Sequence, residues 1–140
     1  MSANEFMRPS VSNGHPGEQA QIRQWWHEVH HAKGSIVWEY YLGDCYLDAM
    51  WFPETGEVGA EYPGKRAPMA FPLGGKPVVL CEAKTRLTPG LVGQALLYSA
   101  LARRAGADVR SVVIFAQRYS PSFRIAAIEL GLEVVIPEES

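Results

Sequence analysis

Residues 77–84 read PVVLCEAK, and this stretch decides the fold. The continuous apolar run from Val78 to Cys81 is typical of a central strand that is buried on both faces. Residues two apart in a strand share a face, so Glu82 and Lys84 are predicted to project to the same side. A carboxylate and an ammonium group are therefore expected side by side where this strand ends.

The segments that follow this strand alternate between helix and strand. Thr88 and Pro89 supply an N-cap and a proline at the first helical position, which predicts a helix through Leu91 to Arg104 that stops before Gly106. Residues 110–117 are predicted to form a second buried strand. Ser120-Pro121 then opens a short helix that ends at Gly131, and residues 132–136 form a last strand.

The segments that precede residue 77 predict one helix and a hairpin. Apolar residues recur at helical spacing from Gly17 to Lys33, before Gly34. Residues 35–42 and 45–52 are rich in β-branched and aromatic residues and are separated only by Gly43-Asp44, which suits a type II′ turn. Residues 53–76 are dense in glycine and proline and are predicted to form a long loop.

The predicted order is helix, three strands, helix, strand, helix, strand. It indicates an α/β fold with a mixed central sheet flanked by helices. At 140 residues the chain fits a single domain, residues 17–140, after a loose N-terminal arm of residues 1–16. The composition contains no apolar stretch long enough for a membrane span, and we expect a cytoplasmic protein with Cys45 and Cys81 as free thiols.

The hairpin and the central strand together predict a cluster of acidic side chains. The two-residue turn places Glu39 opposite Asp48 on one face. If the strand of Asp48 lies beside that of Glu82, three carboxylates converge with Lys84. Such oxygen-rich clusters suit Mg²⁺ or Mn²⁺, which would polarise a phosphate while Lys84 positions or activates a water molecule.

These residues resemble the PD-(D/E)xK signature of restriction-endonuclease-like nucleases. Asp48 lies in a second strand, and Glu82-Ala83-Lys84 closes a hydrophobic third strand. The resemblance covers nearly all of residues 17–136 and is nearest to Holliday-junction-resolvase and Mrr-like members. It also includes Gly17-Glu18, Gly93-Gln94, Val112 to Phe115, Tyr119-Ser120-Pro121 and Gly131 to Val134.

The resemblance implies a role for each site residue. Asp48, Glu82 and the backbone carbonyl of Ala83 would bind the metal, with Glu39 as a further candidate ligand. Gln94 would orient the region around the nucleophile, and Glu18, preferred over Glu28 on the helical wheel, would reach the site from the first helix. Leu47 stands where the signature has proline. The function implied is metal-dependent endonucleolytic cleavage of DNA, which could be branched, by a homodimer.

The net charge of the chain gives the prediction of a DNA partner little support. A formal net charge of −2 does not by itself suggest a nucleic-acid partner. Two interpretations stay open, namely a one-sided basic patch and scattered solvated charges. The residues in question are Lys65, Arg66, Arg103, Arg104, Arg110, Arg118 and Arg124. Lys65, Arg66, Arg86 and Arg118 are the candidate nucleic-acid contacts.

Two other functions compete with catalysis by a nuclease. The chain could be a catalytically inactive nucleic-acid-binding or structural domain of the same fold. Residues 27–31 also spell a literal HExxH, the zinc-metalloprotease pattern, although no histidine follows His31 to complete the ligand set. The sequence does not distinguish DNA from RNA.

Overall fold

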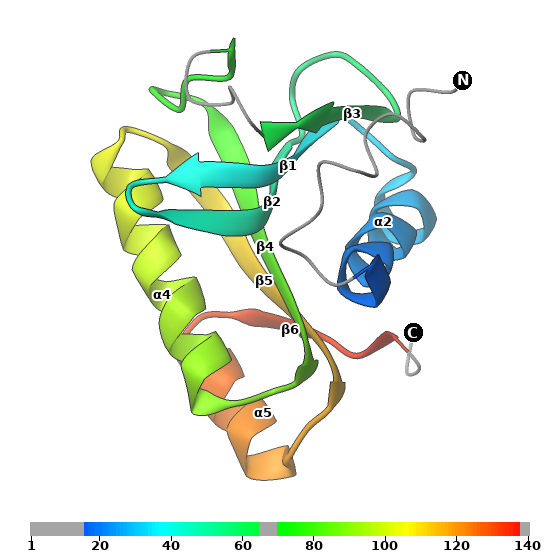
Figure 1. Cartoon of the computed structure of the whole chain (residues 1–140), viewed down its shortest axis with the longest axis vertical. Coiled ribbons are helices and arrows are strands. Elements are labelled where there is room, and N and C mark those ends of the chain that lie inside the picture. The colour runs from blue at the N-terminus through cyan, green and yellow to red at the C-terminus, as the bar shows by residue number, and fades with distance from the viewer. Residues whose placement is uncertain (1–15, 65–69, 138–140) are drawn as a thin grey trace.

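The computed structural model describes residues 16–64 and 70–137. Three helices flank a mixed six-stranded sheet in this part of the chain, as Figure 1 shows, so the expected α/β class is confirmed. The elements are α2 (Pro16–His30), β1 (Ser35–Leu42), β2 (Cys45–Phe52), β3 (Ala60–Pro63), β4 (Pro77–Arg86), α4 (Pro89–Arg104), β5 (Asp108–Arg118), α5 (Pro121–Glu129) and β6 (Glu133–Val135).

The sheet has the strand order β3-β1-β2-β4-β5-β6. β1 pairs with β2, and β2 with β4, in antiparallel fashion, whereas β5 is parallel to both β4 and β6. In consequence the ends of β4 and β5 and the starts of α4 and α5 lie at the same end of the sheet (Figure 1). This end is where the chemistry-bearing residues gather.

The predicted element order is wrong in one place, because β3 lies inside the segment expected to be a loop. β3 runs parallel to β1, with Ala60 opposite Ser35. Its four residues are too few to show a periodic pattern, and tertiary contacts hold them. The Glu61 carboxylate accepts hydrogen bonds from the Arg23 guanidinium and from Trp38 Nε1, which ties β3 to α2 and to β1.

The first helix ends earlier than the apolar spacing predicts. It stops at His30, because His31 and Ala32 both adopt left-handed backbone conformations, with φ of 54° and 53°. Gly34 follows with φ of 80°, and a side chain there would collide with the Phe52 carbonyl. The glycine therefore lets the chain turn closely past β2 into β1. Of the predicted arm, residues 1–16, Pro16 instead begins α2, and residues 1–15 lie outside the described residues.

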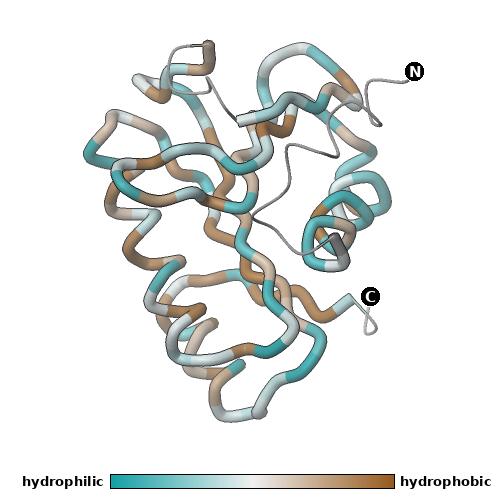
Figure 2. The backbone as a smooth tube through the Cα atoms, viewed as in Figure 1, coloured by the Kyte–Doolittle hydropathy of each residue, from teal (hydrophilic) through white to brown (hydrophobic). Residues whose placement is uncertain are grey.

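Two apolar clusters, one on each face of the sheet, form the core. Ile22, Trp25 and Trp26 of α2 pack on one face, and α4 and α5 cover the other. Figure 2 shows this arrangement as largely hydrophobic central strands beside an α2 coil that is mostly hydrophilic on its outside.

Cys81 lies in this core, and both it and Cys45 are free thiols. No helix among the described residues has the length and apolar character to cross a membrane.

Candidate active site

The site begins where β2 and β4 stop pairing. The last paired residues of this antiparallel ladder are Ala49 and Cys81. Beyond this pair, side-chain carboxylates take the place of backbone carbonyls as hydrogen-bond acceptors. The Asp48 amide donates to Glu82 Oε1 at 2.8 Å, and the Ala83 amide donates to Asp48 Oδ2 at 2.8 Å. The two carboxylates thus replace main-chain acceptors, and they are held together at the point where the strands separate.

β1 is also irregular beside Asp48. Glu39 has a left-handed φ of 51°, which costs a non-glycine residue roughly 1–2 kcal/mol. The side-chain alternation changes phase here, since Trp38 packs in the α2 cluster while Tyr40, two residues on, packs in the α4 cluster. The β1–β2 register is the same before and after Glu39, so Glu39 lies opposite Asp48, as predicted. The two residues do not, however, pair as the rest of the ladder does. Backbone strain of this kind is often found at functional sites.

Burial and mutual repulsion make the two carboxyls weak acids. Burial raises the pKa of Asp48 to about 6, and the charges of Glu18 and Glu39 add to the rise. Burial, followed by the charge of Asp48, raises the pKa of Glu82 to about 8. The backbone hydrogen bonds and Lys84 oppose both shifts. The pair therefore holds about one proton near neutral pH, and a cation placed between them would release it.

An open groove of about 480 Å³ is lined by Lys84 and Glu18, whose charges act on both carboxylates. Lys84, which is exposed and two residues beyond Glu82 on β4, lines it. Gln94 on the first turns of α4 and Glu18 at the start of α2 line it as well, so residues far apart in sequence meet here. Its remaining walls are Thr85, Arg86, Thr88, Gly90 and Leu91. An open groove suits a chain-like substrate better than a small molecule, which binds in an enclosed pocket.

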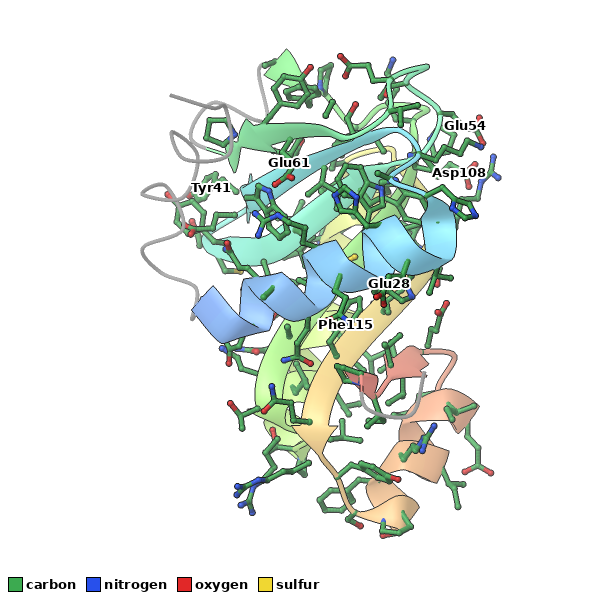
Figure 3. The ribbon with its side chains drawn as sticks, turned by 90° about the vertical axis from the view of Figure 1, so that its right-hand side faces the viewer. Glu28, Tyr41, Glu54, Glu61, Asp108 and Phe115 are labelled. Atoms are coloured by element: carbon green, nitrogen blue, oxygen red, sulfur yellow. The ribbon has the colours of Figure 1, made fainter. Side chains whose placement is uncertain are left out.

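The alternative helix acid lies elsewhere. Glu28 lines a separate depression with Val135 and Pro137, near the end of the described chain. Its carboxylate accepts hydrogen bonds from Gln24 on the same helix. Figure 3 shows Glu28 on α2 close to β6. Of the two glutamates considered in the sequence, only Glu18 is therefore placed at the carboxylate pair.

Tyr98 is a buried residue near the carboxylates that the sequence did not predict. It is buried on α4, and its pKa is raised by burial first and then by the charge of Glu82. Its hydroxyl also interacts with Cys45. Tyr98 is one helical turn after Gln94, so the i, i+4 relation on the same helix was the signal that could have identified it.

The donor atoms at the site fit a hard divalent cation. Asp48 Oδ1 and Glu82 Oε2 remain outside the two interstrand hydrogen bonds. The N–H and C=O of one strand residue point the same way, so the Ala83 carbonyl faces the gap between β2 and β4, as its amide does. Two carboxylates and a carbonyl, with water completing the shell, are the oxygen ligands that Mg²⁺ prefers.

A third acidic ligand is not in place. Within residues 16–64 and 70–137, no group of three or more His, Cys, Asp and Glu side chains is arranged to hold a metal ion. Glu39 and Glu18 act on Asp48 through their charge. The expected convergence of three carboxylates is thus reduced to the Asp48–Glu82 pair with two acidic neighbours.

The basic residues do not form the single patch considered from the sequence. Arg110 lies near the start of β5 and pairs with Asp108, whereas Arg118 ends that strand roughly 26 Å away. Arg103 and Arg104 lie in the last turn of α4, far from its groove-lining first turns. Arg86 and Arg118 are opposite each other at the ends of β4 and β5. Lys65 and Arg66 lie outside the described residues.

The HExxH sequence does not adopt the geometry of a zinc-binding helix. His27 is on α2, but His31 lies beyond the helix end with φ of 54°. The two histidines are therefore not stacked one turn apart on a helical face, as that motif requires. His27, Glu28 and His31 are all exposed.

A scan against models of protein families found no match to this chain, and searches of curated proteins and of solved structures found none either.

Proposed function

We propose that this chain is a metal-dependent nuclease that hydrolyses phosphodiester bonds in DNA at the Asp48–Glu82 pair. The observation that carries the proposal is the pair itself: two buried carboxylates from adjacent strands, each hydrogen-bonded to the other strand, with raised pKa values and a lysine two residues away. Strongly perturbed acids near a groove are frequent at functional sites.

Asp48, Glu82 and the Ala83 carbonyl would hold the metal, which would be Mg²⁺ or Mn²⁺. A bound divalent ion would supply Lewis-acid stabilisation of the phosphate and a lower pKa for a coordinated water. Lys84, exposed at the rim of the groove, orients that water and offsets the charge that develops on the phosphate. Gln94 and Glu18 position the phosphate and the attacking water from the two helices.

DNA is proposed as the substrate because the groove continues toward basic residues. Arg86 lines the groove beside Lys84, and Arg118 lies opposite Arg86 on β5. Cationic side chains along the exit of a hydrolytic site bind a phosphate backbone through counterion release. This local charge exists although the chain is acidic overall, at −2.

A homodimer is part of the same proposal, since one small domain with one site cuts one strand. Leu97 on α4 and Ile125 and Ile128 on α5 are more than half exposed, on the helices that cover one sheet face. Apolar side chains in this position favour contact with a second copy. Light scattering checks the dimer: a monomeric mass together with full activity would exclude it.

The test of the function is cleavage with matched variants. Purified protein is incubated with supercoiled plasmid, and with duplex and branched oligonucleotides, in roughly 5–10 mM Mg²⁺ or Mn²⁺, which saturates even a weak site. Wild type should nick the DNA, and Glu82→Ala and Lys84→Ala should each reduce the rate by about 10²-fold or more. Chelation with EDTA should stop the reaction.

Glu28→Ala is the matched control, because it removes a glutamate from an exposed position on α2 that lies away from the pair. It should cleave like wild type. Equal nicking by wild type, Glu82→Ala and Lys84→Ala would reveal a contaminating nuclease and would contradict the proposal. Tight DNA binding with no cleavage under any metal would instead support an inactive binding domain of this fold.

A further inference from the structure

A second groove adjoins the candidate site at the same end of the sheet. It has a volume of about 350 Å³ and is lined by Arg86, Leu87, Arg118, Tyr119, Ser120 and Phe123. Arg86 lines both grooves, so the second groove continues the first away from the carboxylates. Figure 1 shows why: β4 and β5 end together, and the chain turns from them into α4 and α5.

The charges of this second groove favour an anion. Arg86 and Arg118 are directly opposite each other in the β4–β5 register, and both are exposed. Like charges placed opposite each other in a sheet are destabilising. No ion pair to an acidic side chain within residues 16–64 and 70–137 compensates either arginine. A phosphate group between the two guanidinium groups would remove this repulsion through charge-assisted hydrogen bonds.

The same groove offers aromatic surface next to that charge. Phe123 on the first turn of α5 is 43 % exposed, so part of its ring is open to a ligand. Tyr119 is half-buried, and the Arg124 guanidinium lies 5.1 Å from the centre of its ring. Aromatic rings beside arginines are the combination that binds unpaired bases, through stacking and cation–π contacts.

We propose that the second groove binds an unpaired nucleotide that adjoins the scissile phosphate, with its phosphate on Arg86 and Arg118 and its base against Phe123 and Tyr119. A base inside a duplex has both faces covered by its neighbours, so only a nucleotide outside the stack can use these rings. The inference rests on the proposed function of the adjoining site. It selects DNA with single-stranded or frayed ends at the cut, such as a flap or a branch, over fully paired DNA.

Binding, measured without cleavage, tests the groove. Fluorescence anisotropy in EDTA gives the affinity of the full chain for three labelled DNAs: oligo(dT), a blunt duplex, and that duplex with an unpaired thymidine flap. Wild type should bind the flap DNA more tightly than the blunt duplex. Phe123→Ala should weaken binding of flap DNA and of oligo(dT) by about 10-fold and leave the blunt duplex almost unchanged.

Matched variants separate stacking from other effects on α5. Phe123→Trp keeps an aromatic face and should restore binding, whereas Phe123→Leu keeps apolar bulk and should not. Leu130→Ala removes another exposed apolar side chain, at the C-cap of the same helix, and should bind like wild type. Equal weakening by Phe123→Ala for blunt and flap DNA, or no weakening for either, would overturn the inference.

Two arginine variants on β5, one at each end of the strand, test the phosphate site. Arg118→Ala should reduce the slope of log affinity against log salt for oligo(dT) by about 0.7, the value for one lost phosphate contact to a single strand. Arg110→Ala, which changes the same charge at the other end of β5, should leave the slope unchanged. An unchanged slope in Arg118→Ala would contradict the phosphate site.

The two proposals can fail separately. Cleavage that depends on Glu82, combined with no effect of Phe123→Ala on flap binding, keeps the nuclease and rejects the groove. Selective flap binding through Phe123, without any metal-dependent cleavage, keeps the groove and rejects the nuclease.

Discussion

The two halves of β4 have opposite tasks. From Val79 to Cys81 the strand is paired on both sides, and its side chains fill the two cores. From Glu82 onward it remains paired with β5 but separates from β2, and its side chains include a carboxylate, an ammonium and a guanidinium group. The change takes place within one residue, between Cys81 and Glu82.

The difference shows how a buried strand can end in a chemical site. When β2 and β4 separate, the amides of Asp48 and Ala83 lose main-chain acceptors, and leaving a buried N–H unpaired costs about 1–3 kcal/mol. The two carboxylates satisfy these amides, at the expense of being held close to each other. The first half of β4 therefore stabilises the fold. The second half holds two buried acids close together, which lowers the stability of the fold but favours the binding of a cation.

The largest predicted effect comes from comparing one substitution in each half of β4. Glu82→Gln should reduce cleavage by about 10³-fold, because the metal loses a charged ligand, yet it should leave the fold intact. Leu80→Ala, two residues earlier on the same face, should lower the free energy of unfolding by about 2–5 kcal/mol, because it opens a cavity in the core. Urea unfolding and cleavage assays on both variants check this.

Two results would contradict the comparison. Glu82→Gln should be as stable as wild type or more stable at pH 8, since it removes a buried charge; marked unfolding would show that Glu82 is structural. Leu80→Ala should retain metal-dependent cleavage in the fraction that stays folded. Loss of cleavage in folded Leu80→Ala would show that the halves are not independent.

The next largest effect is a loss of stability as the pH rises, which a bound metal ion should counteract. The raised pKa of Glu82, about 8, means that its contribution to stability is fully present at acidic pH and is lost as the pH rises through 8. Asp48 acts in the same direction around pH 6. In EDTA, Tm should therefore fall between pH 5.5 and 8.5. Mn²⁺ at about 100 times its Kd should raise Tm at pH 8 by roughly 5–10 °C.

The control for this experiment is a pair of variants. Asp48→Asn and Glu82→Gln should each flatten the fall of Tm with pH in EDTA and should abolish the rise with Mn²⁺. Asp44→Asn, on the exposed hairpin turn, should behave like wild type in both respects. A rise of Tm with Mn²⁺ that persists in Glu82→Gln would place the ion elsewhere.

The sequence predicted the parts of the fold that depend on local patterns. The apolar run of β4, the N-cap at Thr88, and the glycine turn of the hairpin, where Gly43 has φ of 72°, all lie where those patterns placed them. β3 was missed because it depends on Glu61 meeting Arg23 and Trp38, which no local pattern contains. Short strands that are fixed by tertiary contacts override weak propensity.

The candidate site was predictable in its members but not in its geometry. Alternation on β4 and the turn register on β1–β2 placed Asp48, Glu82 and Lys84 correctly relative to their strands. The separation of β2 from β4, and the left-handed conformation of Glu39, depend on how several strands twist against one another. For this reason a regular ladder predicted Glu39 as a ligand, whereas Glu39 lies in an irregular position next to Asp48.

The smallest predicted effect concerns this neighbour. Glu39→Gln removes a negative charge that raises the pKa of Asp48, and this charge is the weakest of the causes acting on that carboxyl. The lower end of the pH–activity profile should therefore move slightly to more acidic pH, with the rate at pH 8 and the Mn²⁺ affinity almost unchanged. Glu28→Gln, an exposed control on α2, should not move it. If Glu39→Gln instead weakened Mn²⁺ binding by 10-fold or more, about the loss expected for a ligand or its close support, Glu39 would contact the ion directly, and the irregular position on β1 would belong to the metal site itself.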